Sequence, residues 1–112
     1  DAIACVVPAF ADALAFFRVA APDDTAPTPH HQHHQHHLAS EARERFEVTY
    51  QNAKAQLLQL GAGGHSQIHT VYDWLARLSD LRRAVEQADK AVQRLAALPD
   101  LATTPDEPAP SA

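Results

Sequence analysis

An unbroken heptad pattern of apolar residues over residues 66–98 constrains the fold of this chain more than any other feature. Apolar side chains recur three and four residues apart, which is the spacing of one face of an α-helix. In heptad notation they alternate between a and d positions. The a positions are Val71, Leu78, Val85 and Val92, and the d positions are Trp74, Leu81, Ala88 and Leu95. The pattern predicts one long amphipathic helix over residues 66–98, which Pro99 is expected to end.

A second helix is predicted over residues 38–60, where apolar residues again follow helical spacing. Its expected buried stripe is Phe46, Tyr50, Ala53, Leu57 and Leu60. All three glycines of the chain follow at positions 61, 63 and 64. A phosphate-binding loop is one interpretation of such a cluster, but the lysine and the preceding strand that it requires are missing. The glycines therefore predict a sharp turn between two helices, with Gly61 as the left-handed helix cap.

The first twenty residues predict a shorter helix. Its expected core-facing stripe is Ile3, Val7, Phe10, Leu14 and Phe17. A helix beginning near Pro8 would keep proline in the first turn, where it is tolerated. Pro8, Asp12 and Arg18 interrupt the apolar run, so it is expected to fall short of a membrane span.

Residues 21–37 are rich in proline and histidine and predict a linker, with His36 and His37 at the edge of the next helix. Residues 99–112 form an acidic, proline-rich tail. The expected organisation is thus an N-terminal helix within residues 1–20, a linker over 21–37, a helical hairpin over 38–98 and the tail.

These elements predict an all-α fold, an antiparallel helical hairpin with a shorter N-terminal helix. At 1.5 Å per residue the longer hairpin helix spans about 50 Å and the shorter about 35 Å. The shorter helix would then cover the longer one only to about Ala88. Val92 and Leu95 would need cover from the first helix, giving a closed three-helix monomer, or from another chain, giving an oligomeric bundle. We favour the second arrangement because small domains bury little apolar surface alone.

The charge and the cysteine content of the chain exclude some classes of function. The net charge is −5, with the acidic surplus at the two ends of the chain, so a basic nucleic-acid-binding stripe is not expected. Cys5 is the single cysteine, which excludes an intramolecular disulfide and fits an intracellular compartment. The chain contains no Met, so we expect a processed or excerpted sequence. No nucleophile, dinucleotide or zinc-finger motif is present, and an enzyme is not expected.

Two groups of histidines are candidate metal ligands. Imidazole binds Zn, Ni or Cu, but a flexible tract would offer overlapping sites, and a low-complexity insertion is the alternative. The tract comprises His30, His31, His33, His34, His36 and His37. A second group, His65, His69 and Asp73, has the i, i+4, i+8 spacing of one helical face. That face points away from the heptad seam.

The sequence therefore predicts a non-enzymatic assembly or scaffold module that binds a protein partner or its own copy through the heptad seam. A metal-binding protein that holds Zn or Ni with its histidine tract is the alternative. The seam residues expected to contact the partner are Val71, Trp74, Leu78, Leu81, Val85, Val92 and Leu95.

Overall fold

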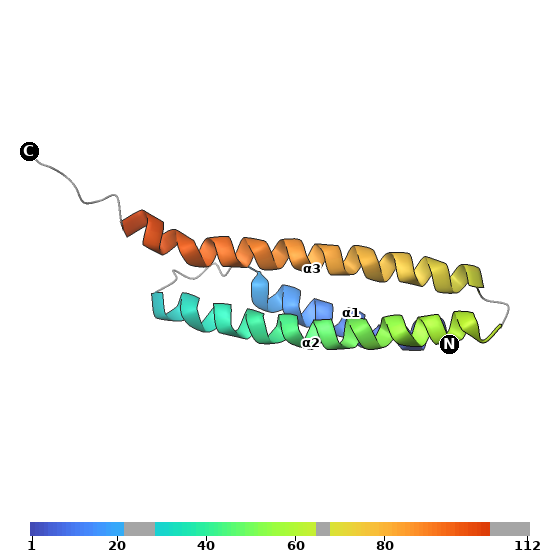
Figure 1. Cartoon of the computed structure of the whole chain (residues 1–112). Helices are drawn as coiled ribbons and strands as arrows, with labels where there is room; N and C mark the ends of the chain where they lie inside the picture. Colours follow the sequence, from blue (N-terminus) through green and yellow to red (C-terminus); the bar gives the residue numbers. More distant parts are fainter. Residues whose placement is uncertain (22–28, 65–67, 104–112) are drawn as a thin grey trace, which may run out of the picture.

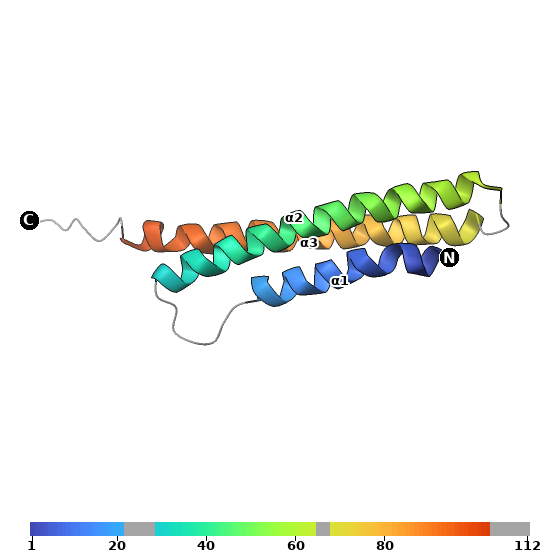
Figure 2. The ribbon, with the colours of Figure 1, turned by 90° about the horizontal axis from the view of Figure 1, so that it is seen from below.

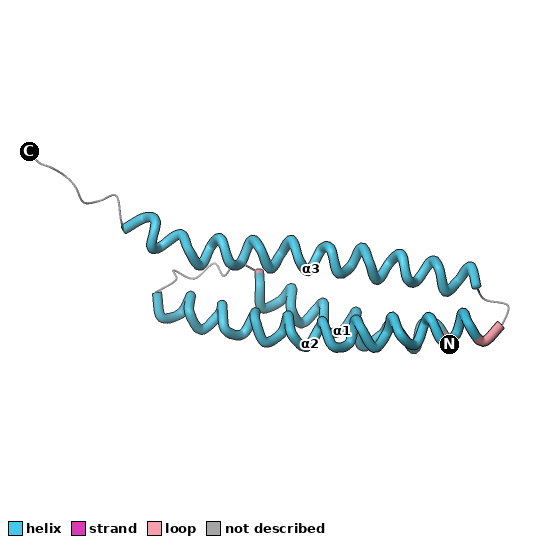
Figure 3. Tube along the Cα trace, viewed as in Figure 1, coloured by secondary structure: helices cyan, strands magenta, loops and turns pink. Residues whose placement is uncertain are grey.

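The computed structural model describes residues 1–21, 29–64 and 68–103, with the backbone alone for 29–33 and 98–103. These residues form three helices, α1 (Ala2–Ala20), α2 (Pro29–Ala62) and α3 (Ile68–Thr103). The helices lie side by side in an elongated up-down-up bundle, so that α1 and α3 run parallel and α2 runs against both (Figures 1 and 2). Every regular element in the described ranges is a helix (Figure 3). The predicted all-α fold is confirmed.

α1 begins six residues earlier than Pro8, and the prediction that it starts near that proline is wrong. Asp1 caps the helix, because its carboxylate Oδ1 accepts a 3.0 Å hydrogen bond from the Ile3 amide. Proline inside a helix leaves the carbonyl four residues earlier without its usual donor. Here Pro8 and Ala4 both lie on the exposed side of α1, where water can satisfy that carbonyl.

The buried face of α1 differs from the predicted one by one residue. The bundle buries a stripe of mostly small residues, and the predicted stripe lies largely outside it. Ile3, Val7 and Leu14 are 55%, 54% and 56% exposed. Small side chains let helix axes approach closely, which favours the alanine-rich stripe at the contact with α2 and α3. The buried residues are Ala2, Val6, Ala9, Ala13 and Phe16.

α2 begins at Pro29, nine residues before the predicted start, so the prediction that the linker extends through residue 37 is wrong. The histidine tract is helical. Gln35, inside the tract, explains part of the difference: its side-chain amide donates to the carbonyls of Val19 at 2.9 Å and Ala21 at 3.1 Å. These hydrogen bonds connect the first turns of α2 to the end of α1. Ala39 and Ala42 extend the buried face of α2 toward this contact.

The turn between α2 and α3 also differs from prediction. α2 continues to Ala62, and the glycine with a left-handed backbone is Gly64, at φ 75°, rather than Gly61. Gly61 instead lies against α3, where an added Cβ would meet Val71 at 3.5 Å. α3 begins at Ile68 and continues through Pro99 to Thr103, so Pro99 does not end it. Pro99 would deprive the Leu95 carbonyl of its donor, and Leu95 is exposed to water.

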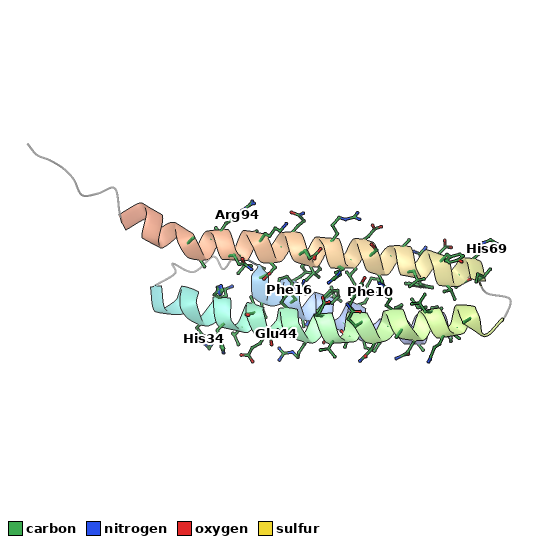
Figure 4. All side chains as sticks on the ribbon, in the orientation of Figure 1. Phe10, Phe16, His34, Glu44, His69 and Arg94 are labelled. Carbon is green, nitrogen blue, oxygen red and sulfur yellow. The ribbon has the colours of Figure 1, made fainter. Side chains whose placement is uncertain are left out.

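The core of the bundle is one cluster formed by all three helices. The predicted α2 stripe is confirmed at Phe46, Tyr50, Ala53 and Leu57, which are buried, whereas Leu60 is half-buried. Phe10 and Phe16 of α1 lie between the helices, while Glu44 of α2 and Arg94 of α3 point away from the bundle (Figure 4).

Candidate interaction surface

The heptad seam of α3 is used mainly inside the chain. Val71, Leu78 and Val85 are buried in the core. Trp74 packs edge-to-face on Phe10 of α1, with ring centroids 6.1 Å apart and planes at 84°. Its other side is covered by the guanidinium of Arg77, 4.8 Å from the ring centroid. Trp74 thus contributes to the contact between α1 and α3.

The remaining predicted seam residues are less buried. Leu81, Ala88 and Val92 are half-buried against the core, and Leu95 is 50% exposed. Only the last of these offers a largely exposed apolar side chain. The exposed part of the seam is therefore its C-terminal end.

A polar cluster links α2 and α3 along one edge of their contact. The carboxylate of Glu47 accepts two hydrogen bonds from Arg82, at 2.9 and 3.3 Å. Arg43 at 3.1 Å and Gln51 at 2.9 Å donate to the same carboxylate from neighbouring turns of α2. The Arg82 guanidinium also lies 4.9 Å from the ring centroid of Tyr50. The cluster holds the two helices in register.

The hydrogen bonds of this cluster favour the charged forms of Glu47 and Arg82. Partial burial on its own would raise the pKa of Glu47, but the hydrogen bonds from Gln51, Arg43 and Arg82 outweigh it, so the pKa is lowered. The hydrogen bond to Glu47 raises the pKa of Arg82. Glu47 and Arg82 are not among the residues that the sequence predicts to interact. The position of Glu47 directly after the buried Phe46, at a flank of the stripe where interhelical ion pairs form, is the signal that could have found this pair.

The outward face of α1 is an apolar surface outside the core. Besides Ile3, Val7 and Leu14 it carries the exposed Ala4 and Ala11. The helix contains two charged residues, Asp12 and Arg18. Contrary to expectation, α1 is long and apolar enough to cross a membrane, by length and composition. Core helices of soluble proteins meet the same criterion, and one face of α1 is part of the core.

The structure brings few of the candidate metal ligands together. His37 lies one turn from Glu41, with 3.0 Å between Nε2 and Oε1, and both side chains are largely exposed. His34 is exposed and His36 half-buried, while the side chains of His30, His31 and His33 lie outside the described residues. Within the described part of the chain, groups of three or more His, Cys, Asp or Glu arranged to hold a metal ion are not found.

The second histidine group lies far from the first. His69 and Asp73 are exposed near the start of α3, and His65 lies outside the described residues. His34 and His69 are at opposite ends of the bundle (Figure 4). The α2 helix between His34 and Ala62 is about 40 Å long. The two groups therefore cannot share one metal ion within a single chain.

Comparison with known protein families, with curated proteins and with solved structures finds no match to this chain.

Proposed function

We propose that this protein is a non-enzymatic helical assembly module that binds another protein chain through an exposed apolar helix face. The observation that carries the proposal is the outward face of α1, where Ile3, Val7 and Leu14 share one side of the helix and are each more than half exposed. Single exposed apolar residues are common on soluble proteins, but contiguous apolar faces mark interaction sites. A face of this kind gains free energy when another chain covers it.

The proposal moves the main interaction surface from the α3 seam to α1. Three of the seven predicted seam residues are buried within the chain, and Trp74 is occupied by Phe10 and Arg77. Leu95 keeps the end of the seam available as a secondary contact. The charged cluster around Glu47 supports the same interpretation, because its groups hold two helices together rather than face a substrate pocket.

Light scattering during gel filtration of the full chain tests the proposal. We expect a concentration-dependent mass above that of the monomer, or a complex with a protein partner. The variant Val7→Glu/Leu14→Glu should lose this association. Val48→Glu is the matched control, because Val48 is 61% exposed on α2 and is not part of the face. A strict monomer at about 50 μM that also captures no partner through α1 contradicts the proposal.

A second candidate function is metal binding by the histidine tract, and the observation that favours it is the helical tract itself. Histidines four residues apart on a helix project from the same face and can chelate one ion. The pairs His30/His34 and His33/His37 have this spacing within α2. A helix gives them the fixed geometry that an extended linker would not.

Calorimetry with Zn²⁺ or Ni²⁺ tests this second function. Replacing His34 and His37 by Gln should weaken binding at least tenfold, whereas His69→Gln, at the other end of the bundle, should leave it unchanged. Absence of binding at micromolar metal in the intact chain contradicts metal handling.

A further inference from the structure

We infer that the chain which covers the outward face of α1 is α1 of a second copy, packed antiparallel to the first. The inference rests on the proposed assembly function and specifies its partner and geometry. It follows from the side chains on the face and from the charges at the two ends of the helix.

The exposed face of α1 has its own heptad register, separate from the stripe that packs on α2 and α3. Ala4, Val7, Ala11 and Leu14 follow each other at spacings of three, four and three, and all four are exposed. Alanine alternates with a branched aliphatic residue along this seam. The alanines allow two helix axes to approach closely, and Val7 and Leu14 fill the space between them. The face is thus suited to another helix of the same kind.

Charge favours the antiparallel orientation. Asp1 caps the N-terminus of α1, and Arg18 lies in its last turn. The two residues are about 26 Å apart along the helix. An antiparallel pair places each Arg18 beside the Asp1 carboxylate of the partner, whereas a parallel pair would set like charges together. The helix dipoles favour the same orientation.

The third charged residue does not oppose this pairing. Asp12 is half-buried, and five residues at 100° each place it on the far side of the helix from Val7. The centre of the antiparallel seam, between Val7 and Ala11, is therefore free of charge.

A membrane surface is a less suitable occupant. Interfacial helices carry several Lys or Arg residues beside their apolar face, and anionic lipid attracts basic chains. α1 has one basic residue, and the chain has a net charge of −5. Insertion across a bilayer would also remove Val6 and Phe16 from the core, where they are 2% and 0% exposed. A second α1 covers the outward face and leaves the bundle intact.

Cysteine cross-linking of the full chain tests the geometry. Pairing Asp1 with Arg18 of the partner puts the two-fold axis midway between them, near Ala9 and Phe10. In a Cys5→Ser background, two Ala11→Cys residues are then about 4.5 Å apart along the helix axes, so the two thiols should meet. Two Ala4→Cys residues would be about 16 Å apart, beyond the reach of a disulfide, which needs Cα atoms within about 7 Å. Val48→Cys on α2 measures cross-linking by random collision.

We expect rapid disulfide-linked dimers from Ala11→Cys, and from Ala4→Cys only the slow rate of the Val48→Cys control. Efficient cross-linking of both α1 variants would mean a parallel pair and would overturn the inference. Association that is lost in Val7→Glu/Leu14→Glu but gives no cross-linking at Ala11 would mean another partner or geometry on the same face: the inference fails while the assembly function stands. Association that survives Val7→Glu/Leu14→Glu overturns both. A monomer that binds lipid vesicles through α1 overturns both.

Discussion

Substituting each of two adjacent valines, Val6 and Val7, tests which face of α1 is buried in the bundle. Val6 is 2% exposed and Val7 is 54% exposed. Each Val→Ala change removes two methylene equivalents, worth about 0.8 kcal/mol each when buried. At Val6 the residual cavity adds up to about 1 kcal/mol, and the better helix propensity of alanine returns about 0.5 kcal/mol. We therefore expect Val6→Ala to lower the free energy of unfolding by about 2 kcal/mol.

The same substitution at Val7 should be close to neutral in the monomer, because the side chain is exposed and alanine is the better helix former. Urea unfolding at low micromolar protein, where association is weak, measures both changes. The m-value should stay constant if only native stability changes. The reasoning is refuted if Val7→Ala destabilises the monomer as much as Val6→Ala, because the periodicity-based stripe would then be the core-facing one.

Two further predictions concern the polar contacts. Glu47→Gln should destabilise the fold by about 1 kcal/mol or less at neutral pH, since the cluster is partly exposed. Because the folded-state pKa of Glu47 is lowered, this contribution is present above the ordinary glutamate pKa and is lost as pH falls through the lowered value. Unfolding curves of the two proteins should therefore converge in acid, below the ordinary glutamate pKa. Gln35→Ala removes two hydrogen bonds to the end of α1 and should cost about 1 kcal/mol in thermal unfolding; an unchanged melting temperature would contradict that role.

The fold class and the faces of two helices could be predicted from the sequence because their apolar stripes are unambiguous. In α3, polar or small residues flank Leu78 and Val85, so one face is the sole candidate for burial. In α2, Phe46 stands between the charged Arg45 and Glu47, and Leu57 continues the same stripe at helical spacing. The structure buries all four residues.

The spacing of apolar residues did not identify the buried face of α1, because that helix is apolar on nearly all sides. Two stripes, one residue apart, have the same spacing, and hydrophobicity favours the one with Ile3, Val7 and Leu14. The structure instead buries the alanine-rich stripe, because its small side chains allow α1 to approach α2 and α3 closely. This close approach depends on the opposing helices and cannot be obtained from one segment alone.

The start of α2 also depends on tertiary contacts. Histidine has a modest helix propensity and the preceding segment is rich in proline, so the sequence predicted a linker. Two residues stabilise the helical conformation through contacts that only this conformation makes. Gln35 donates to a carbonyl at the end of α1, and Ala39 packs in the core. The spacing of Gln35 and Ala39, four residues apart in line with Ala42 and Phe46, is the signal that could have extended the helix.

The longer α2 changes which surface needs another chain. With α2 beginning at residue 38, its length would have left α3 uncovered beyond about Ala88. The nine additional residues extend α2 by about 14 Å, and Val92 is half-buried in the bundle. The two hairpin helices are therefore more nearly matched in length than predicted. Among the residues of α3 with described side chains, Leu95 near its end is half exposed. An apolar surface without cover lies instead along α1, where Ile3, Val7 and Leu14 face away from the bundle, so the case for assembly now depends on α1.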